Sequence, residues 1–183
     1  MSSDASPAPL KGPPASPFDD PDLVALALSE RRRATCMVAG SPAEQRLAFR
    51  IRDEVFVREQ GLFDSTDRDP HDDDPCTRHV LGLYGPVVAG TVRLYPLEEP
   101  GIWQGDRLAV LPEFRRSNIG GPLVRFAVRT ASEAGGEMML AEVQLDNVRF
   151  FEHLGWHRLG EPRDYVGVPH QQMAIDLTGR ERR

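Results

Sequence analysis

Short apolar runs of strand length alternate with amphipathic stretches of helix length along residues 34–177, which restricts the chain to a mixed α/β fold. Helices are expected from a cap at Ser41 to about Gln60, and then over 122–134 and 147–154. Strands are expected over 34–39, 79–84, 87–97, 106–111 and 138–145, with one or two more within 156–177. This order of elements predicts one mixed domain rather than a bundle or a sandwich.

The first helix carries the clearest local signal. Residues 41–44 (Ser-Pro-Ala-Glu) match a capping box with proline at the first helical position. Leu47, Ile51 and Val55 share one face at helical spacing. Gly61 is expected to end the helix.

A chain of 183 residues suffices for one domain with a tail. Six of its 16 prolines lie in residues 1–21, a segment rich in Ser, Ala and Asp. We expect this segment to be disordered, because it cannot bury enough apolar area to offset the entropy of ordering. A linker or short helix is expected over 22–33, the folded domain over 34–177 and a basic tail over 178–183.

The charge balance excludes one class of partner. The chain has 22 Lys and Arg against 28 Asp and Glu, a net charge of −6, whereas a non-specific nucleic-acid binder needs a basic face. The longest apolar run, Leu23–Leu28, is far below the roughly 20 residues that span a bilayer, so no membrane contact is expected. Two cysteines cannot build a disulfide framework and fit a reducing compartment, so we expect a cytoplasmic protein.

The polar segment 112–121 carries the strongest chemical signal. It precedes an amphipathic helix whose first amides lack internal partners and lie at the positive end of the helix dipole. With Arg115 and Arg116 beside them, these amides form a ready anion site. A plain polar turn into a helix is the alternative, because the spacing matches neither the Walker loop nor the dinucleotide GxGxxG motif.

The same segment resembles a known family motif. Arg115-x-x-Asn118-Ile119-Gly120 is similar to the Arg/Gln-x-x-Gly-x-Gly/Ala loop of the GNAT superfamily of N-acetyltransferases. Residues 107–110 (Arg-Leu-Ala-Val) resemble the fourth strand of that family, and 147–156 resemble its Asn…Phe-Tyr-x-x-x-Gly-Phe helix. The resemblance extends over about 34–177.

The resemblance implies a GNAT-type acyl-CoA N-acyltransferase fold, with acetyl-CoA as co-substrate and no metal. In that family the loop amides hold the coenzyme A pyrophosphate, and a backbone amide of the bulged fourth strand holds the thioester carbonyl. The residues that this resemblance assigns to the cofactor are Val110, Arg115, Arg116, Ser117, Asn118, Ile119, Gly120, Gly121 and Asn147.

Two positions depart from the family pattern. The first loop glycine is Asn118, the non-glycine residue that best tolerates left-handed backbone angles, so the loop shape can persist. The tyrosine that often protonates the departing thiolate is Phe151, which has no proton to donate. Another group, the solvent or a different acyl chemistry must therefore replace it.

Further motifs indicate a branch and a reaction. Residues 55–60 (Val-Phe-Val-Arg-Glu-Gln) and 93–96 (Arg-Leu-Tyr-Pro) resemble small bacterial acetyltransferases and acyl-homoserine-lactone synthases. With 168–173, the whole pattern most resembles a nitrogen-starvation-associated N-acetyltransferase subfamily. We expect acetyl transfer to a small-molecule or peptide amine by direct attack in a ternary complex. The alternatives are a signal synthase that uses acyl carrier protein and a non-catalytic coenzyme A-binding sensor, and a homodimer is one expected assembly.

Two carboxylates are candidates for the base that deprotonates the amine. Glu142 lies in the strand 138–145, on the face opposite Ala141 and Val143, where burial would raise its pKa. Its alternative is a strand-end carboxylate paired with an arginine. Glu59 ends the first helix and is expected to face the acceptor cleft, unless it is a solvated helix terminus. His79, His153 and His170 are candidate acids or substrate contacts, and Tyr165 is a candidate replacement for the missing tyrosine.

Residues 62–76 form a loop crowded with aspartate. The spacing of Asp67, Asp69, His71 and Cys76 matches neither a calcium loop nor a zinc site. We expect a solvated acidic loop, and a sharper hypothesis is that it attracts a cationic amine.

Overall fold

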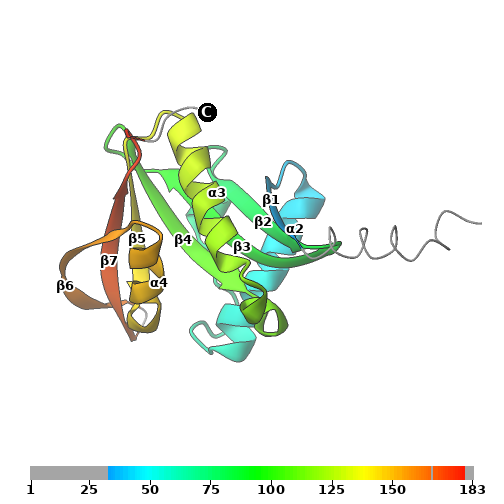
Figure 1. Cartoon of the computed structure of the whole chain (residues 1–183). Coiled ribbons are helices and arrows are strands. Elements are labelled where there is room, and N and C mark those ends of the chain that lie inside the picture. Colours follow the sequence, from blue (N-terminus) through cyan, green and yellow to red (C-terminus); the bar gives the residue numbers. More distant parts are fainter. Residues whose placement is uncertain (1–32, 166, 180–183) are drawn as a thin grey trace, which may run out of the picture.

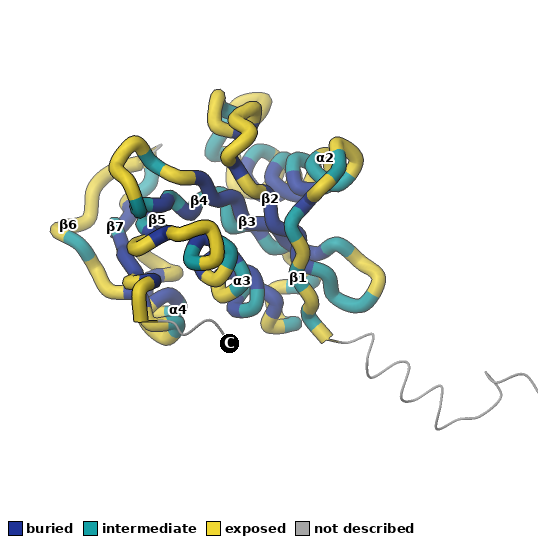
Figure 2. The backbone as a smooth tube through the Cα atoms, turned by 90° about the horizontal axis from the view of Figure 1, so that it is seen from above, coloured by how far each residue is buried: buried dark blue, intermediate teal, exposed yellow. Residues whose placement is uncertain are grey.

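A computed structural model of the chain describes residues 33–165 and 167–179. One sheet of seven strands, in the order β1-β2-β3-β4-β5-β7-β6, is covered by helices on both faces (Figures 1 and 2). The strands are β1 (Ala34–Val38), β2 (Arg78–Tyr84), β3 (Val87–Pro96), β4 (Ile102–Val110), β5 (Met138–Gln144), β6 (His157–Tyr165) and β7 (Val168–Asp176). The helices are α2 (Pro42–Arg52), the π-helix η1 (Asp53–Glu59), α3 (Gly120–Glu133), α4 (Val148–His153) and the 3₁₀ turns η2 (Pro70–Asp73), η3 (Pro112–Ser117) and η4 (Leu145–Asn147).

The expected mixed α/β fold is confirmed. The expected tail over 1–21 and the last residues, 180–183, of the expected basic tail lie outside the described residues. The linker or short helix expected over 22–33 also lies outside them, apart from Arg33.

The pair β4–β5 interrupts an otherwise antiparallel sheet. These two strands run parallel, and they pair only between Ile102–Gly105 and Met138–Ala141. Both strands continue beyond that point, to Val110 and Gln144, and they separate there (Figure 1). The fold therefore opens the sheet between two of its central strands.

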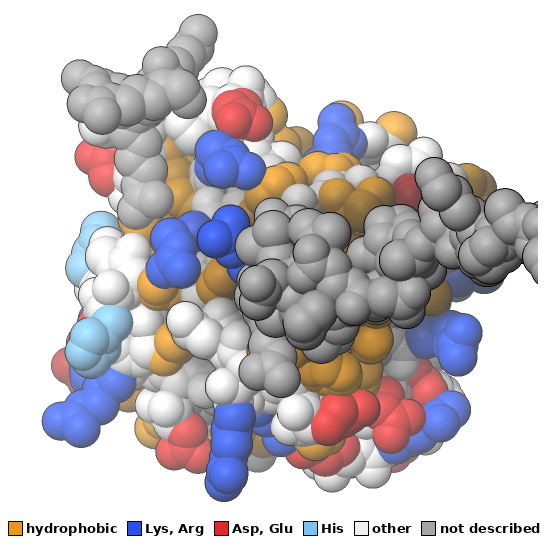
Figure 3. Space-filling model, turned by 45° about the vertical axis from the view of Figure 1, so that its right-hand side comes forward, with side chains coloured by type: hydrophobic (Ala, Val, Ile, Leu, Met, Phe, Trp, Pro, Cys, Tyr) orange, Lys and Arg blue, Asp and Glu red, His pale blue; other side chains and the backbone are white. Residues whose placement is uncertain are grey.

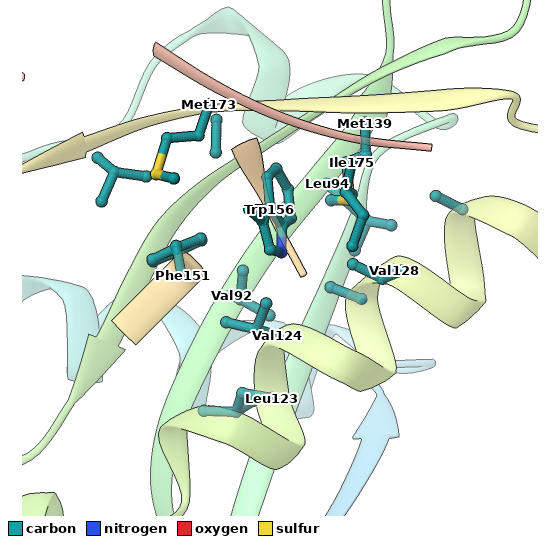
Figure 4. Close-up of a cluster of buried hydrophobic side chains, with 14 of the residues drawn as sticks. Val92, Leu94, Leu123, Val124, Val128, Met139, Phe151, Trp156, Met173 and Ile175 are labelled. Atoms are coloured by element: carbon teal, nitrogen blue, oxygen red, sulfur yellow. The ribbon is translucent and has the colours of Figure 1, made fainter. Parts of the chain in front are cut away.

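The helices bury two separate apolar layers. On one face, α3 and α4 cover the main core, in which Leu123 and Val128 pack toward Val92, Met139 and Trp156 (Figure 4). On the other face, α2 and η1 cover a smaller cluster. Figure 2 shows the buried strands between these layers, with α2 on one side and α3 and α4 on the other.

The start of the first helix confirms the capping box. The Glu44 N–H donates to Ser41 Oγ (3.3 Å), and the Ser41 N–H donates to Glu44 Oε2 (2.9 Å). The helix does not remain α-helical to Gln60, however. It widens into η1 after Arg52, where the Gln60 N–H donates to Val55 O, five residues earlier. Apolar residues at 3.6-residue spacing do not reveal this wider turn.

The strand β4 is longer than expected, because it begins at Ile102 rather than at residue 106. Gly105 hides the strand pattern in the sequence, because glycine is uncommon in strands. In the structure this position is closely packed, since a Cβ there would lie 2.5 Å from Met139 Cε. The expected polar loop over 112–121 is partly helical, since it contains η3 and the first two residues of α3.

The acidic loop is not a solvated loop, and that expectation is wrong for its central aspartates. Asp67 and Asp72 are buried, and Asp69 is partly buried. They pair with arginines of α2, β3 and β4. We call this cluster the buried ion-pair network; it comprises Arg52, Asp67, Asp69, Asp72, Arg93, Asp106 and Arg107.

Bidentate contacts hold the network together. Arg52 donates to both oxygens of Asp72 (2.6 and 2.9 Å) and to Asp67 (2.7 Å). Arg93 donates to both oxygens of Asp69 (2.6 and 2.7 Å) and to both of Asp106 (2.8 and 2.6 Å). The loop therefore secures the fold, and three of its aspartates are not free to attract an amine.

His79 lies against this network without a hydrogen bond from either ring nitrogen to a described residue. Its Nε2 is 3.8 Å from Asp72 Oδ1, and its ring meets Phe49 edge-on. Burial lowers the pKa of His79, and the guanidiniums of Arg52 and Arg93 oppose its protonation further. For Asp72, burial alone would raise the pKa, but the hydrogen bonds from Arg52 outweigh burial and hold the pKa well below its usual range.

These shifts predict that acid destabilises the protein in two stages. The unfolded chain binds a proton at His79 below about pH 6.5 while the folded chain does not, so the free energy of unfolding falls from there. The aspartates stabilise the fold above about pH 4, and this stabilisation is lost as the pH falls through their lowered folded pKa values. Urea unfolding between pH 8 and pH 3 measures both stages. His79→Leu should flatten the first stage only, whereas the exposed-site control His157→Leu should leave both unchanged; an unaltered first stage in H79L would contradict the assignment.

None of the helices in the described ranges has the length and hydropathy needed to cross a membrane. Within the same ranges, no group of three His, Cys, Asp or Glu side chains could hold a metal ion. On the face drawn in Figure 3, acidic and basic side chains both surround apolar ones, so the charge there is not of one sign.

Candidate active site

A cavity of about 370 Å³ lies where β4 and β5 separate. Side chains from both faces of the sheet line it, because successive residues of a strand point to opposite faces. On the α3 side we call the lining the apolar wall, which includes Val124, Ala127, Met139, Val143, Phe151 and Trp156. On the η1 side we call it the polar wall, which includes Gln60, Tyr95, Glu142, Gln144, Arg163 and His170.

Strand register brings the polar wall together from distant parts of the chain. Gln144 of β5 lies opposite His170 of β7, and His170 lies opposite Arg163 of β6. The Gln144 side-chain amide donates to Gln60 Oε1 (3.3 Å), which ties the wall to the end of η1. The cavity therefore connects an apolar compartment and a polar compartment through the sheet.

A bulge in β4 shapes the cavity edge. The β3 partner of Ala109 is Thr91, but the partner of Asp106 is Arg93, so β4 holds one extra residue there. Arg107 takes the left-handed conformation (φ 53°), which costs a non-glycine residue about 1–2 kcal/mol. Its guanidinium donates to Asp67 O and to Asp69 Oδ2 (3.1 Å), so the buried ion-pair network holds the strained residue in place.

The amide of Val110 points toward the cavity side of β4. The Leu111 N–H donates to Ala89 O (2.9 Å), so Leu111 and Ala89 form a hydrogen-bonded pair. The neighbouring pair, Val110 and Gly90, is then of the non-hydrogen-bonded type, which turns the Val110 N–H away from β3. The pairing of β4 with β5 stops at Gly105 and Ala141, so no described residue of β5 pairs with β4 at the level of this amide.

The loop before α3 presents further backbone amides. The backbone of Asn118 is left-handed (φ 56°, ψ 30°), a conformation that asparagine adopts more readily than most residues. Ile119 is fully buried and anchors the loop. Gly120 and Gly121 open α3, and no side chain caps this end. Their N–H groups have no intrahelical acceptor, so they are free to bind an anion.

Arg115 and Glu59 form a bidentate ion pair between η3 and the end of η1. Arg115 also donates through Nε to Val110 O (3.2 Å). The hydrogen bonds from Arg115 hold the pKa of Glu59 below its usual value, which makes Glu59 a weaker proton acceptor than the sequence suggested. Arg116 and Ser117 lie beside this pair on η3, and Arg116 is exposed.

Glu142 lies in the polar wall, on the face opposite Ala141 and Val143 as the strand pattern predicts. It is not an isolated buried carboxylate. Arg163 of β6 pairs with it through both the Nη2 and Nε groups. The arrangement corresponds to the expected alternative, a carboxylate paired with an arginine, but within the cavity lining.

The comparisons with known proteins bear on this geometry. Residues 44–156 match the model of the acetyltransferase (GNAT) family. The chain belongs to the GNAT family. It is 27% identical over 144 residues to the uncharacterized N-acetyltransferase YjcF of Bacillus subtilis, a match that covers 76% of this chain and 98% of that protein.

Solved structures share the GNAT fold with this chain. A Lactobacillus plantarum protein of known crystal structure has a TM-score of 0.71 at 24% identity, covering 79% of this chain and 98% of that one. The coenzyme A-dependent acyl-homoserine lactone synthase BjaI has a TM-score of 0.61 at 23% identity, covering 75% and 76%. At these identities the likeness establishes the fold alone, and the resemblance to the superfamily is confirmed.

The remaining candidates fall into two groups within the GNAT fold. Asn147, Tyr165 and His170 line the cavity, and the His170 Nδ1 lies 2.7 Å from Val168 O. His79 is buried in the ion-pair network and His153 is exposed on α4, so neither reaches the cavity. Sequence reasoning missed Arg163, Tyr95 and Gln60, because nothing local marks residues that only the folding of distant strands and of the end of η1 brings to one wall.

Phe151 stands where the resembled family often has a tyrosine, so a packed ring without a hydroxyl group takes that position. It is buried in the apolar wall beside Trp156 (Figure 4), and its ring meets those of Trp156 and Phe150 edge-on. A ring in this position excludes water from the compartment but offers no proton. The cavity groups able to donate one are in the polar wall, where burial raises the pKa of Tyr95 above its usual value and His170 is buried.

Proposed function

We propose that the protein transfers an acyl group, most simply acetyl, from acyl-CoA to an amine within a ternary complex. One observation carries this proposal: where β4 and β5 separate, the cavity has an apolar wall on the α3 side and a polar wall on the η1 side. One compartment suits an apolar acyl-pantetheine arm and the other suits a polar acceptor. The two reactants can therefore meet in the gap.

The loop residues would hold the phosphates of coenzyme A by their amides. Gly120 and Gly121 supply unpaired N–H groups, and Asn118 gives the loop its turn. A Cβ at Gly120 would have its nearest neighbour, Phe150 Cζ, at 3.4 Å, so the protein's own packing does not require glycine there. A bare backbone at this position fits a bulky anion that approaches the amides closely.

Arg115, Arg116 and Asn147 would support the same ligand. Arg115 would exchange Glu59 for a phosphate, since its planar fork suits either anion. Ser117 and Ile119 complete the loop, Ile119 by filling the core beneath it. The thioester itself supplies an activated acyl carbon and a thiolate leaving group.

In the reaction, the amine nitrogen bonds to the acyl carbon while the carbon–sulfur bond breaks and the thiolate leaves with its electron pair. The Val110 N–H would stabilise the charge that develops on the carbonyl oxygen. An alkylammonium has a pKa of about 10, so it is protonated near neutral pH and must lose a proton before its nitrogen can attack. In this proposal a carboxylate accepts that proton. We propose Glu142 as this base and keep Glu59 as the second candidate. The proton taken up by the thiolate would come from His170, Tyr165 or solvent, because Phe151 has none to give.

A free-thiol assay tests the proposal. Acetyl-CoA and longer acyl-CoA donors are offered with amines, amino acids and peptide N-termini, and thiol release is followed. Amine-dependent release supports acyl transfer from coenzyme A. Release only with acyl carrier protein would favour the signal-synthase alternative, and coenzyme A binding without release from any donor would favour a sensor. A cytoplasmic location and a homodimer stay predictions.

Replacing Gly120 by alanine should separate folding from cofactor binding. The free energy of unfolding should stay unchanged or rise by up to about 1 kcal/mol, because alanine orders more readily in a helix. Coenzyme A binding should weaken about tenfold, or about 1.4 kcal/mol, because the methyl group occupies the phosphate position. Isothermal calorimetry measures the Kd, with urea unfolding in parallel.

The matched control is Gly40→Ala, at a position with space for a Cβ and remote from the cavity, which should leave the Kd unchanged. In the same titration, Arg115→Ala should weaken binding, whereas Glu59→Gln should preserve or strengthen it by freeing Arg115. Equal affinity for coenzyme A in wild type, G120A and R115A would refute the phosphate site.

A further inference from the structure

The polar wall holds one ion pair that the fold does not need. Glu142 and Arg163 pair across β7, which separates their strands. The Arg163 side chain remains 60% exposed, and the Glu142 side chain 15%. Because the Arg163 side chain is largely exposed, water can replace the carboxylate around its guanidinium when a ligand opens the pair.

The other charged side chains that line the cavity already form ion pairs with residues outside it. Among the lining residues that the structure describes, the charged side chains are Asp106, Arg107, Glu142 and Arg163. Arg93 holds Asp106, and the acidic loop holds Arg107. An incoming acceptor therefore has one carboxylate and one guanidinium available to it.

The presence of one carboxylate and one guanidinium discriminates between classes of amine. A simple alkylammonium can bind Glu142 but offers no anionic group to the guanidinium of Arg163, so it gains one of the two available contacts. A lysine side chain or a peptide N-terminus would do the same, because neither carries a carboxylate beside its ammonium group. A free α-amino acid carries both charges on one carbon, so it can insert between the two side chains and satisfy both.

We propose that the acceptor is a zwitterionic α-amino acid, bound through its ammonium group by Glu142 and through its carboxylate by Arg163. The guanidinium fork matches a carboxylate with two parallel hydrogen bonds. Glu142 then contacts the nitrogen that must lose a proton before it attacks. This assignment rests on the proposed acyl transfer and narrows it to one substrate class.

The test compares each amino acid with the amine that lacks only its carboxylate. Suitable pairs are alanine and ethylamine, phenylalanine and phenethylamine, tyrosine and tyramine, and arginine and agmatine. With acetyl-CoA as donor, wild-type kcat/KM should favour the amino acid of at least one pair by about tenfold or more, as expected for a charge-assisted contact. Arg163→Gln should abolish this preference by raising KM for the amino acid, with little change in KM for the amine.

Two further variants isolate the contact. Arg163→Lys keeps the charge without the fork and should restore part of the preference. Arg158→Gln removes the neighbouring β6 arginine, which pairs with Glu152 away from the cavity lining, and should leave the preference intact. Equal kcat/KM within every pair, or a preference that persists in R163Q, would overturn the proposal.

A binding measurement tests the proposed amino-acid site independently of acyl transfer. If acetyl transfer occurs but ignores the carboxylate, the substrate class is wrong and the proposed function stands. If no thiol is released, calorimetry of each amino acid and amine against the coenzyme A-loaded protein still decides. Tighter binding of an amino acid than of its matched amine, lost in R163Q, would support the site; equal binding would refute it.

Discussion

Arg93→Met is expected to lower the free energy of unfolding by about 3–5 kcal/mol, because it leaves buried carboxylates without their partner. The Arg93 side chain is 1% exposed and contacts Asp69, Asp72 and Asp106 together. Methionine fills the volume of the stem but supplies no charge or donor. Urea unfolding followed by circular dichroism measures the change, read from the midpoint at an unchanged m-value.

Two companion variants make this result interpretable. Arg58→Met removes an arginine that is 67% exposed and pairs with Asp53 and Glu54, so its effect should stay below about 1 kcal/mol. Arg93→Lys keeps the charge but loses the bidentate fork, and should fall between the other two. A loss in R93M no larger than that in R58M would show that the network does not stabilise the fold.

Glu142→Gln is expected to lower kcat about 10²-fold, the usual contribution of a positioned general base. Glutamine preserves the size and most of the polarity of the side chain but cannot take the proton of the ammonium group. The deficit should shrink as the pH rises toward the pKa of the acceptor ammonium, because more neutral amine then exists in solution. Thiol release at saturating acetyl-CoA, measured across pH, tests both statements.

The matched control is Glu152→Gln, which removes a carboxylate from a comparable pair with Arg158 outside the cavity lining. Its kcat should equal that of the wild type. A wild-type rate in E142Q would remove Glu142 from the chemistry, and Glu59→Gln would then be the next variant to measure. A deficit in E142Q that does not depend on pH would indicate a binding role without proton transfer.

Features fixed within a few residues were predictable from the sequence. The capping box at Ser41 and the side of β5 that carries Glu142 both follow from local stereochemistry. Each depends on neighbours in the chain, so no knowledge of the sheet is needed. The mixed fold follows likewise from the alternation of short apolar and amphipathic segments.

Features that depend on distant partners were not predictable. The aspartates around residue 70 look solvated in the sequence, because nothing local shows that Arg52 and Arg93 will be buried against them. Glu59 looks like a solvated helix terminus for the same reason, although it meets Arg115, and the arginine expected as an alternative partner of Glu142 could not be identified as Arg163. The register of the strands and the position of the acidic loop against the sheet bring these pairs together. Neither can be read from a single sequence.

The parting of β4 from β5 has a kinetic consequence. Because the cavity is lined from both faces of the sheet, donor and acceptor do not have to share one entrance. In the proposed acyl transfer, neither product then has to depart before the other reactant arrives, as it would in a double-displacement enzyme. Double-reciprocal rate plots for this protein should intersect rather than run parallel, and each product should compete with its own parent reactant.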